Sequence, residues 1–305
     1  MNSCARRVSP ASSALILALA AVLGLCQPAP AGETIDRTHK VNKDAIITID
    51  NLAGSVTVTG WNRNEVKITG ALDEQAEGLQ VEGDADRLAI EVKYPKRMRG
   101  NVDGSRLEIQ VPAGSRLEIR SVSADVTLDN VEGAVEINTV SGEVKVRGKP
   151  ASLRAESISG GLDVVAESAK IVLRTISGAI DAAGEAREFS CNSISGGIDV
   201  TAGKNLATLS CETISGNVVV KGPIARKAEW ELATHSGDVK LELAGKIDAR
   251  FRVSTFSGRI ADVFGQQPAR TSRYVPGQEL NHTEGDGGAL IKVDAFSGNV
   301  RIERR

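Results

Sequence analysis

Hydrophobic and polar residues alternate along most of this chain, and a Ser-Gly dipeptide interrupts the alternation at regular intervals. Five consecutive segments read Asn-Thr-Val-Ser-Gly, Glu-Ser-Ile-Ser-Gly, Arg-Thr-Ile-Ser-Gly, Asn-Ser-Ile-Ser-Gly and Glu-Thr-Ile-Ser-Gly. The serines of the whole series are at 123, 141, 159, 177, 195, 215, 236, 257 and 297, so the spacing is 18 residues, then 20 to 21, with a last step of 40. A fixed period of this length indicates a solenoid, in which each coil packs on its neighbours.

Each repeat contains two short apolar stripes. Val135 and Ile137 lie six and four residues before Ser141, and Val144 and Val146 lie three and five residues after it. Intervening residues are mostly charged or small and polar, as in a strand with one buried face. We therefore predict an all-β fold: a parallel β-solenoid with about two strands per 18–21-residue coil, whose equivalent strands stack about 4.8 Å apart. Crossover connections between parallel strands are nearly always right-handed, which favours a right-handed β-helix.

A third ladder of mostly apolar residues lies immediately before the serines, and we expect it to point into the core. Its members are Val122, Val140, Ile158, Ile176, Ile194, Ile214, His235, Phe256 and Phe296. His235 departs from the pattern, and we interpret it as a core or rim histidine rather than a catalytic or metal-binding group.

The regular repeats span residues 117–264, and less regular sequence flanks them. Residues 32–116 predict an N-terminal β region with irregular first coils. Residues 265–289 are polar and glycine-rich and predict a long loop or hairpin. Residues 290–305 predict a terminal coil that closes the stack.

The first residues predict export. Arg6 and Arg7 precede an apolar run from Ala14 to Leu25 and an Ala-Pro-Ala sequence at 29–31, which together are typical of a secretory signal peptide over residues 1–31. Cleavage removes Cys26, whose preceding leucine fits a lipoprotein signal poorly. We expect the mature chain in the periplasm, on the outer surface or outside a bacterial cell, with no transmembrane segment.

Charge argues against a nucleic-acid partner. The whole chain carries a formal charge of −2, and removal of Arg6 and Arg7 with the leader leaves −4, with both signs interspersed. Nucleic-acid binding requires a basic face.

Two cysteines remain after cleavage, Cys191 and Cys211, each four residues before a serine. The period places them on adjacent strands, at a spacing that a disulfide tolerates and in an oxidising compartment. The alternative is a pair of buried thiols that act as small hydrophobic residues.

Three carboxylates form a second candidate site. Asp163, Asp181 and Asp199 each lie four residues after a serine, so they should stack outward on three consecutive coils. Aligned like charges repel, and Ca²⁺ is the hard cation that would relieve them. The alternative is a solvated acidic stripe, and we expect no other cofactor.

The motifs also resemble a known family. The sequence carries Gly60-Trp61-Asn62 after a short strand, Val111-Pro112-Ala113-Gly114 before the repeats, the phased Ser-Gly corners, and Gly287-Gly288 leading to Phe296-Ser297-Gly298-Asn299-Val300. These features resemble the bacterial "putative adhesin" family, domain of unknown function 4097. The resemblance implies a secreted or envelope β-strand-repeat protein and supplies no catalytic residues.

Three functions are compatible with the sequence. The favoured one is a non-catalytic adhesin or surface-binding module for a cell-surface glycan or envelope protein. The second is an envelope assembly or signalling partner that pairs through exposed coil ends. The third is a carbohydrate-active β-helix enzyme, which is disfavoured because aromatic residues make up 3% of the chain and Phe189, Trp230, Phe251 and Phe256 are all expected inside.

Overall fold

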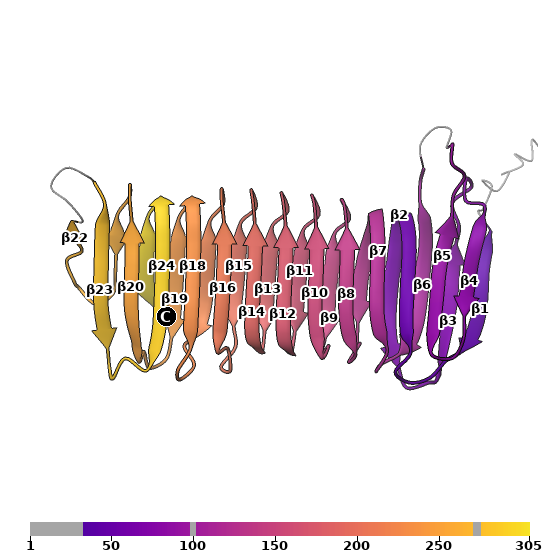
Figure 1. Cartoon of the computed structure of the whole chain (residues 1–305), viewed down its shortest axis with the longest axis horizontal. Helices are drawn as coiled ribbons and strands as arrows, with labels where there is room; N and C mark the ends of the chain where they lie inside the picture. Colours follow the sequence, from indigo (N-terminus) through magenta and orange to yellow (C-terminus); the bar gives the residue numbers. More distant parts are fainter. Residues whose placement is uncertain (1–32, 98–101, 271–275) are drawn as a thin grey trace, which may run out of the picture. The chain divides into compact units, whose positions relative to one another are not determined.

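The computed structural model describes residues 33–97, 102–270 and 276–305, so the predicted signal peptide lies outside the described residues. The described part of the chain forms 25 strands and no helix. In this part we find no helical segment of the length and hydropathy needed to cross a bilayer. Equivalent strands of successive coils pair in parallel, which confirms the predicted β-solenoid (Figure 1).

Two walls of strands enclose the core. Strands that precede the Ser-Gly corners form the front wall, strands that follow them form the back wall, and two long strands run round the corner through both. The front wall contains, in spatial order, β4 (Gly78–Gly83), β5 (Arg87–Lys93), the first part of β2 (Ile46–Trp61), the first part of β7 (Arg116–Asp129), β8 (Ala134–Thr139), β10 (Ser152–Ser157), β12 (Ser168–Thr175), β14 (Ala186–Ser193), β16 (Thr208–Thr213), β18 (Glu229–Ser236), β24 (Ala289–Ser297), β20 (Ala249–Thr255), β23 (Gln278–Glu284) and β22 (Ala269–Arg270). The back wall contains β1 (Thr34–Lys40), β3 (Glu65–Ala71), β6 (Ser105–Pro112), the second parts of β2 and β7, β9 (Val144–Gly148), β11 (Leu162–Ala166), β13 (Ile180–Gly184), β15 (Ile198–Ala202), β17 (Val218–Pro223), β19 (Val239–Ala244), β25 (Val300–Arg304) and β21 (Ile260–Ala261).

The core consists of the predicted ladders. Val135, Ile137, Val144 and Val146 are at most 3% exposed, and the equivalent residues of the neighbouring coils are buried in the same way. Each fully buried valine, leucine or isoleucine contributes roughly 1.5–3 kcal/mol. The large aromatic side chains of Phe189, Trp230 and Phe251 also lie inside, as expected.

The ladder immediately before the serines faces outward, so the expectation that it joins the core is wrong. Ile158 is 45% exposed, Ile214 is 53% exposed and Phe256 is 49% exposed. His235 is exposed as well. The reason is the two-residue period of a strand: because the residues six and four before each serine point inward, the residue two before it points inward too, and the residue one before it points outward.

The inward position two residues before the serine holds a hydroxyl in most coils. These buried residues are Ser121, Thr139, Ser157, Thr175, Ser193, Thr213, Thr234 and Thr255. In Ser157 the Oγ accepts a hydrogen bond from the Gly160 backbone N–H at 2.8 Å. In Thr255 the Oγ1 donates to the Gly298 carbonyl at 2.9 Å. The hydroxyls thus satisfy backbone groups of the corner that would otherwise be buried without a partner.

The corner glycine is required by close approach of the coils. A Cβ on Gly160 would lie 1.8 Å from the Gly142 carbonyl oxygen, and one on Gly196 would lie 1.8 Å from the Gly178 oxygen. A side chain at this corner would therefore push adjacent coils apart.

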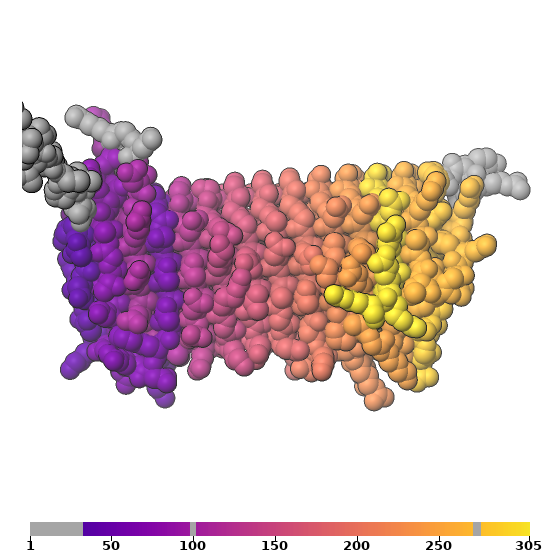
Figure 2. Space-filling view, turned by 180° about the vertical axis from the view of Figure 1, so that it is seen from behind, coloured from indigo at the N-terminus to yellow at the C-terminus, as the bar shows by residue number. Residues whose placement is uncertain are grey.

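The last coil does not close the stack. β24 and β25 lie between the coil of β18 and β19 and the coil of β20 and β21. Figure 2 shows this from behind, where the yellow C-terminal residues lie among orange coils. The last two coils thus have the opposite order in space and in sequence. This order is possible because all coils pair in the same register, and because the connection after β21 is long enough to pass over one coil and return.

At the N-terminal end, too, the order of the coils in space differs from their order in the sequence. β2 pairs with β7 on one side and with β5 and β6 on the other, so the first coil in sequence is the second in space. Antiparallel strands then cover both ends: β4 on β5, β3 on β6, and β23 on β20. Segment 265–289 therefore contains the end-capping strand β23 together with β22.

Candidate functional site: an outer groove on the front wall

The exposed ladder forms a continuous apolar strip along the upper edge of the front wall. We call it the outer ladder, and its members in spatial order are Val122, Val140, Ile158, Ile176, Ile194, Ile214, His235, Phe296 and Phe256. A line of exposed apolar side chains of this length makes this face the candidate interaction site.

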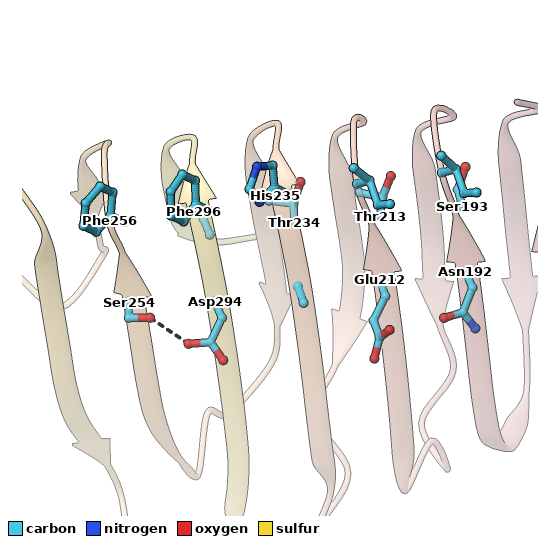
Figure 3. Close-up of a pocket in the computed structure, with 14 residues that line it drawn as sticks. Asn192, Ser193, Glu212, Thr213, Thr234, His235, Ser254, Phe256, Asp294 and Phe296 are labelled. Carbon is cyan, nitrogen blue, oxygen red and sulfur yellow. Dashed lines mark hydrogen bonds between the residues drawn. The ribbon is translucent and has the colours of Figure 1, made fainter. Parts of the chain in front are cut away.

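Two hollows lie beneath the outer ladder and merge into one groove. The larger, of about 570 Å³, runs from β14 to β20, and Figure 3 shows its residues. The other, of about 450 Å³, runs from β8 to β14. The two share Asn192, Ser193 and Ile194, which makes them a single groove on the front wall.

Three aromatic rings continue the outer ladder at the C-terminal end (Figure 3). The His235 and Phe296 ring centroids are 4.6 Å apart with planes at 6°, and those of Phe296 and Phe256 are 4.9 Å apart at 9°. Because the rings stack on each other at the strand spacing, they mainly present edges to the groove.

Beside the outer ladder, the front wall carries a polar row three residues before each serine, and most of its members line the groove. We call this set the polar row, and in spatial order it contains Arg120, Asn138, Glu156, Arg174, Asn192, Glu212, Ala233, Asp294 and Ser254. Some of its charges are paired within the chain. Glu156 contacts Arg174 at 3.3 Å, and the Ser254 hydroxyl donates to Asp294 at 2.6 Å.

A third hollow, of about 470 Å³, extends the same face toward the N-terminal end. Leu52, Val92, Tyr94 and Pro95 supply its apolar lining. Burial raises the pKa of the Tyr94 hydroxyl, which shares a 3.0 Å hydrogen bond with the Ser105 hydroxyl. Burial also raises the pKa of Asp50, although the nearby Arg120 guanidinium opposes this shift.

The predicted acidic ladder lies on the back wall, away from this groove. Asp163, Asp181 and Asp199 are in register on β11, β13 and β15. Arg147 pairs with Asp163, and Lys221 pairs with Asp199 at 2.6 Å. In the residues that the structure describes, Asp181 has no ion pair, and no group of three or more His, Cys, Asp or Glu side chains is arranged to hold a metal. Calcium binding here stays a prediction.

The two cysteines are in register on β14 and β16, buried and unbonded in the structure. The hydrogen bond with Cys191, together with burial, raises the pKa of the Cys211 thiol well above its usual value. A disulfide between them stays a prediction for the oxidised protein.

From the sequence we assigned the outer ladder to the core, and we made no prediction for the buried hydroxyl residues two positions before each serine. The sequence nevertheless contains the pattern that identifies both. A Ser or Thr stands two residues before the serine in nearly every coil, and strict alternation assigns that position, not the next one, to the interior.

Comparison with known proteins gives the chain a family. The Toastrack DUF4097 family model matches residues 45–303, which is most of the chain. No curated protein shows significant sequence similarity to it.

Several solved structures are similar to this one at low identity. A "putative adhesin" from Bacteroides fragilis NCTC 9343 is 14% identical, with 90% of this chain and 98% of that chain covered and a TM-score of 0.45. A "putative lipid binding protein" from Parabacteroides distasonis ATCC 8503 is 13% identical, with 89% and 97% covered and a TM-score of 0.42. A "putative adhesin" from the same strain is 12% identical, with 89% and 97% covered and a TM-score of 0.40. The family match confirms the resemblance in the sequence motifs, and the chain belongs to the Toastrack DUF4097 family.

Proposed function

We propose that this chain is a non-catalytic binding module of the bacterial cell envelope, and that the outer groove is its binding face. One observation carries the proposal: the outer ladder keeps eight apolar side chains, together with His235, in line on the surface, although apolar side chains also fill the interior positions of the coils. Nothing in the core requires these apolar residues outside, so their exposure is best explained by a partner.

The chemistry of the groove suits association rather than bond cleavage. Its acidic groups are separated along the polar row, and Glu156 and Asp294 are already bonded to Arg174 and Ser254. The Phe296 ring lies between the rings of His235 and Phe256, so it has no open face of the kind that sugar stacking needs. This arrangement favours an apolar protein surface over a glycan as the contact.

If the chain is instead an envelope assembly partner, the outer groove is a better candidate for the contact surface than the ends of the stack. The front wall ends in the antiparallel strand β4 on one side and in β23 with the two-residue strand β22 on the other, and the back wall ends in β1 and in the two-residue strand β21. Such short edge strands at the C-terminal end offer little backbone for pairing with another chain.

The test is a binding measurement with two matched variants. Ile158 on the outer ladder and Val165 on the back wall are each 45% exposed. We expect Ile158→Asp to weaken binding of the purified protein to cell-envelope preparations by at least about tenfold, the loss typical of a central contact. Val165→Asp should bind as the unmodified protein does.

A glycan array tests the remaining partner class in parallel. Envelope binding that is equal in the two variants would contradict the proposal, because the groove would then contribute nothing. Glycan binding that depends on Ile158 would retain the groove and change the partner to a carbohydrate.

A further inference from the structure

The structure also indicates what covers this face. Resting on the proposed function of the outer groove as a binding face, we infer that its occupant is a second copy of this chain. The second copy docks with its coils in reverse order, related by a two-fold axis that runs parallel to the strands between β10 and β12.

The polar row carries the inference because its charges are self-complementary. Over six consecutive coils the row reads Arg, Asn, Glu, Arg, Asn, Glu, and the residues are Arg120, Asn138, Glu156, Arg174, Asn192 and Glu212. Reversing this order places every arginine opposite a glutamate and each asparagine opposite an asparagine. Arg120 faces Glu212 of the second copy, Asn138 faces Asn192, and Glu156 faces Arg174. A two-fold interface requires a surface that is complementary to itself in this way.

The same axis fixes the register. A slip of one coil in one direction places Arg174 opposite Arg174 of the second copy, and a slip in the other direction places Glu156 opposite Glu156. Like charges in direct contact across an interface are strongly unfavourable. Within these six coils, only the central register gives opposite charges at all four charged positions. Further out in the same row, Asp294 faces Glu91 of the second copy, and this is a like-charge pair at the edge of the contact.

The apolar groups match under the same operation. Ile158 faces Ile176 of the second copy, Val140 faces Ile194, and Val122 faces Ile214, so six exposed aliphatic side chains of each copy are covered together. Further out, His235 lies opposite the coil of Leu52, and Phe296 lies opposite the coil of β5. These are the coils that form the N-terminal hollow lined by Leu52, Val92, Tyr94 and Pro95.

The area is sufficient for a stable contact. Ten overlapping coils at about 4.8 Å each, with strands about 20 Å long, give a face of roughly 45 by 20 Å, or about 900 Å² per copy. Standard protein interfaces bury about 800 Å² per partner.

The decisive experiment exchanges charges that cannot meet within one copy. Arg120 and Glu212 are five coils apart, about 24 Å. We expect Arg120→Glu and Glu212→Arg each to weaken dimerisation by at least about tenfold, measured by sedimentation equilibrium at low salt. An equimolar mixture of the two variants should recover the dimer, because each copy then presents the complement of the other.

The matched control is Arg301→Glu on the back wall. Arg301 is 64% exposed and lies 3.7 Å from Glu303, while Arg120 is 60% exposed and lies 3.7 Å from Glu118. The control variant should dimerise normally. A protein that stays monomeric to about 100 μM, or a dimer that neither front-wall variant weakens, would overturn the inference.

Envelopes from cells that lack this chain separate the inference from the proposed function. Groove-dependent binding to such envelopes by a monomeric protein would support the proposed function and overturn the second copy as occupant. A dimer restored by the variant mixture, without envelope binding, would support the second copy and overturn the envelope function.

Discussion

Thr175 and Ile176 are neighbours in the chain, yet the fold places them in opposite environments. Thr175 is 5% exposed, and Ile176 is 43% exposed. The threonine hydroxyl accepts a hydrogen bond from the Gly178 N–H at 3.0 Å, while the isoleucine side chain lies on the outer ladder. The comparison shows that strand parity and the backbone groups of the corner decide burial here, and hydrophobicity alone does not.

The largest effect on stability is expected at the corner glycine. Its backbone lies close to the next coil, in the same corner where Thr175 and its equivalents are buried. Gly160→Ala places a Cβ 1.8 Å from the Gly142 oxygen, so adjacent coils must separate. We expect a loss of about 3 kcal/mol in the free energy of unfolding, measured by urea denaturation.

Gly161 provides the control for this substitution. A Cβ there would meet only the Ala179 oxygen at 3.8 Å, and Gly161→Ala should be neutral or stabilising by up to about 1 kcal/mol. Equal losses in the two variants would show that the coil contact is not what requires glycine.

The next effect concerns the buried hydroxyl itself. Thr175→Val keeps the shape and removes the acceptor of the Gly178 N–H and the donor to the Gly160 carbonyl. We expect a loss of about 2 kcal/mol, because a buried N–H is left without a partner. Thr175→Ser keeps the hydroxyl and should lose less; a valine variant as stable as the serine variant would contradict the role of this hydrogen bond.

Sequence periodicity predicted the coil but not the spatial order of coils. Phe256 and Phe296 occupy the same position in their repeats, so nothing local states that β24 lies between β18 and β20. That order depends on long-range pairing of interchangeable coils and on the length of the connection after β21.

The candidate site was hidden for a different reason. Ile158 and Ile176 are apolar, and apolar residues beside a core ladder are normally assigned to the core. Ser157 and Thr175 lie at even spacing from the core residues of their strands, so the two-residue period places them inside and places Ile158 and Ile176 outside. The self-complementary polar row was equally present in the sequence, but it became an interface only once the front wall placed those six residues in line.

The next prediction concerns the three aspartates that face outward on the back wall and their effect on the free energy of unfolding. Asp181 is aligned between Asp163 and Asp199, so Asp181→Asn removes two like-charge contacts. We expect a gain of about 0.5 kcal/mol at low salt, which falls as salt screens the repulsion. Should the row bind Ca²⁺, calcium would instead raise the melting temperature of the unmodified protein and have little effect on the variant.

The smallest effect on stability is expected at Ile176, and it completes the comparison with Thr175. Ile176→Ser changes an exposed side chain with no partner in the core, so the free energy of unfolding should change by no more than about 0.5 kcal/mol. The same substitution lies beside the two-fold axis, where Ile176 faces Ile158 of the second copy, and should weaken dimerisation in sedimentation equilibrium. A variant that unfolds more easily and dimerises normally would mean that Ile176 stabilises its own coil. A variant with unchanged stability and lost dimerisation would mean that the exposed Ile176 acts in the contact between copies, whereas the buried Thr175 beside it stabilises the backbone of its own corner.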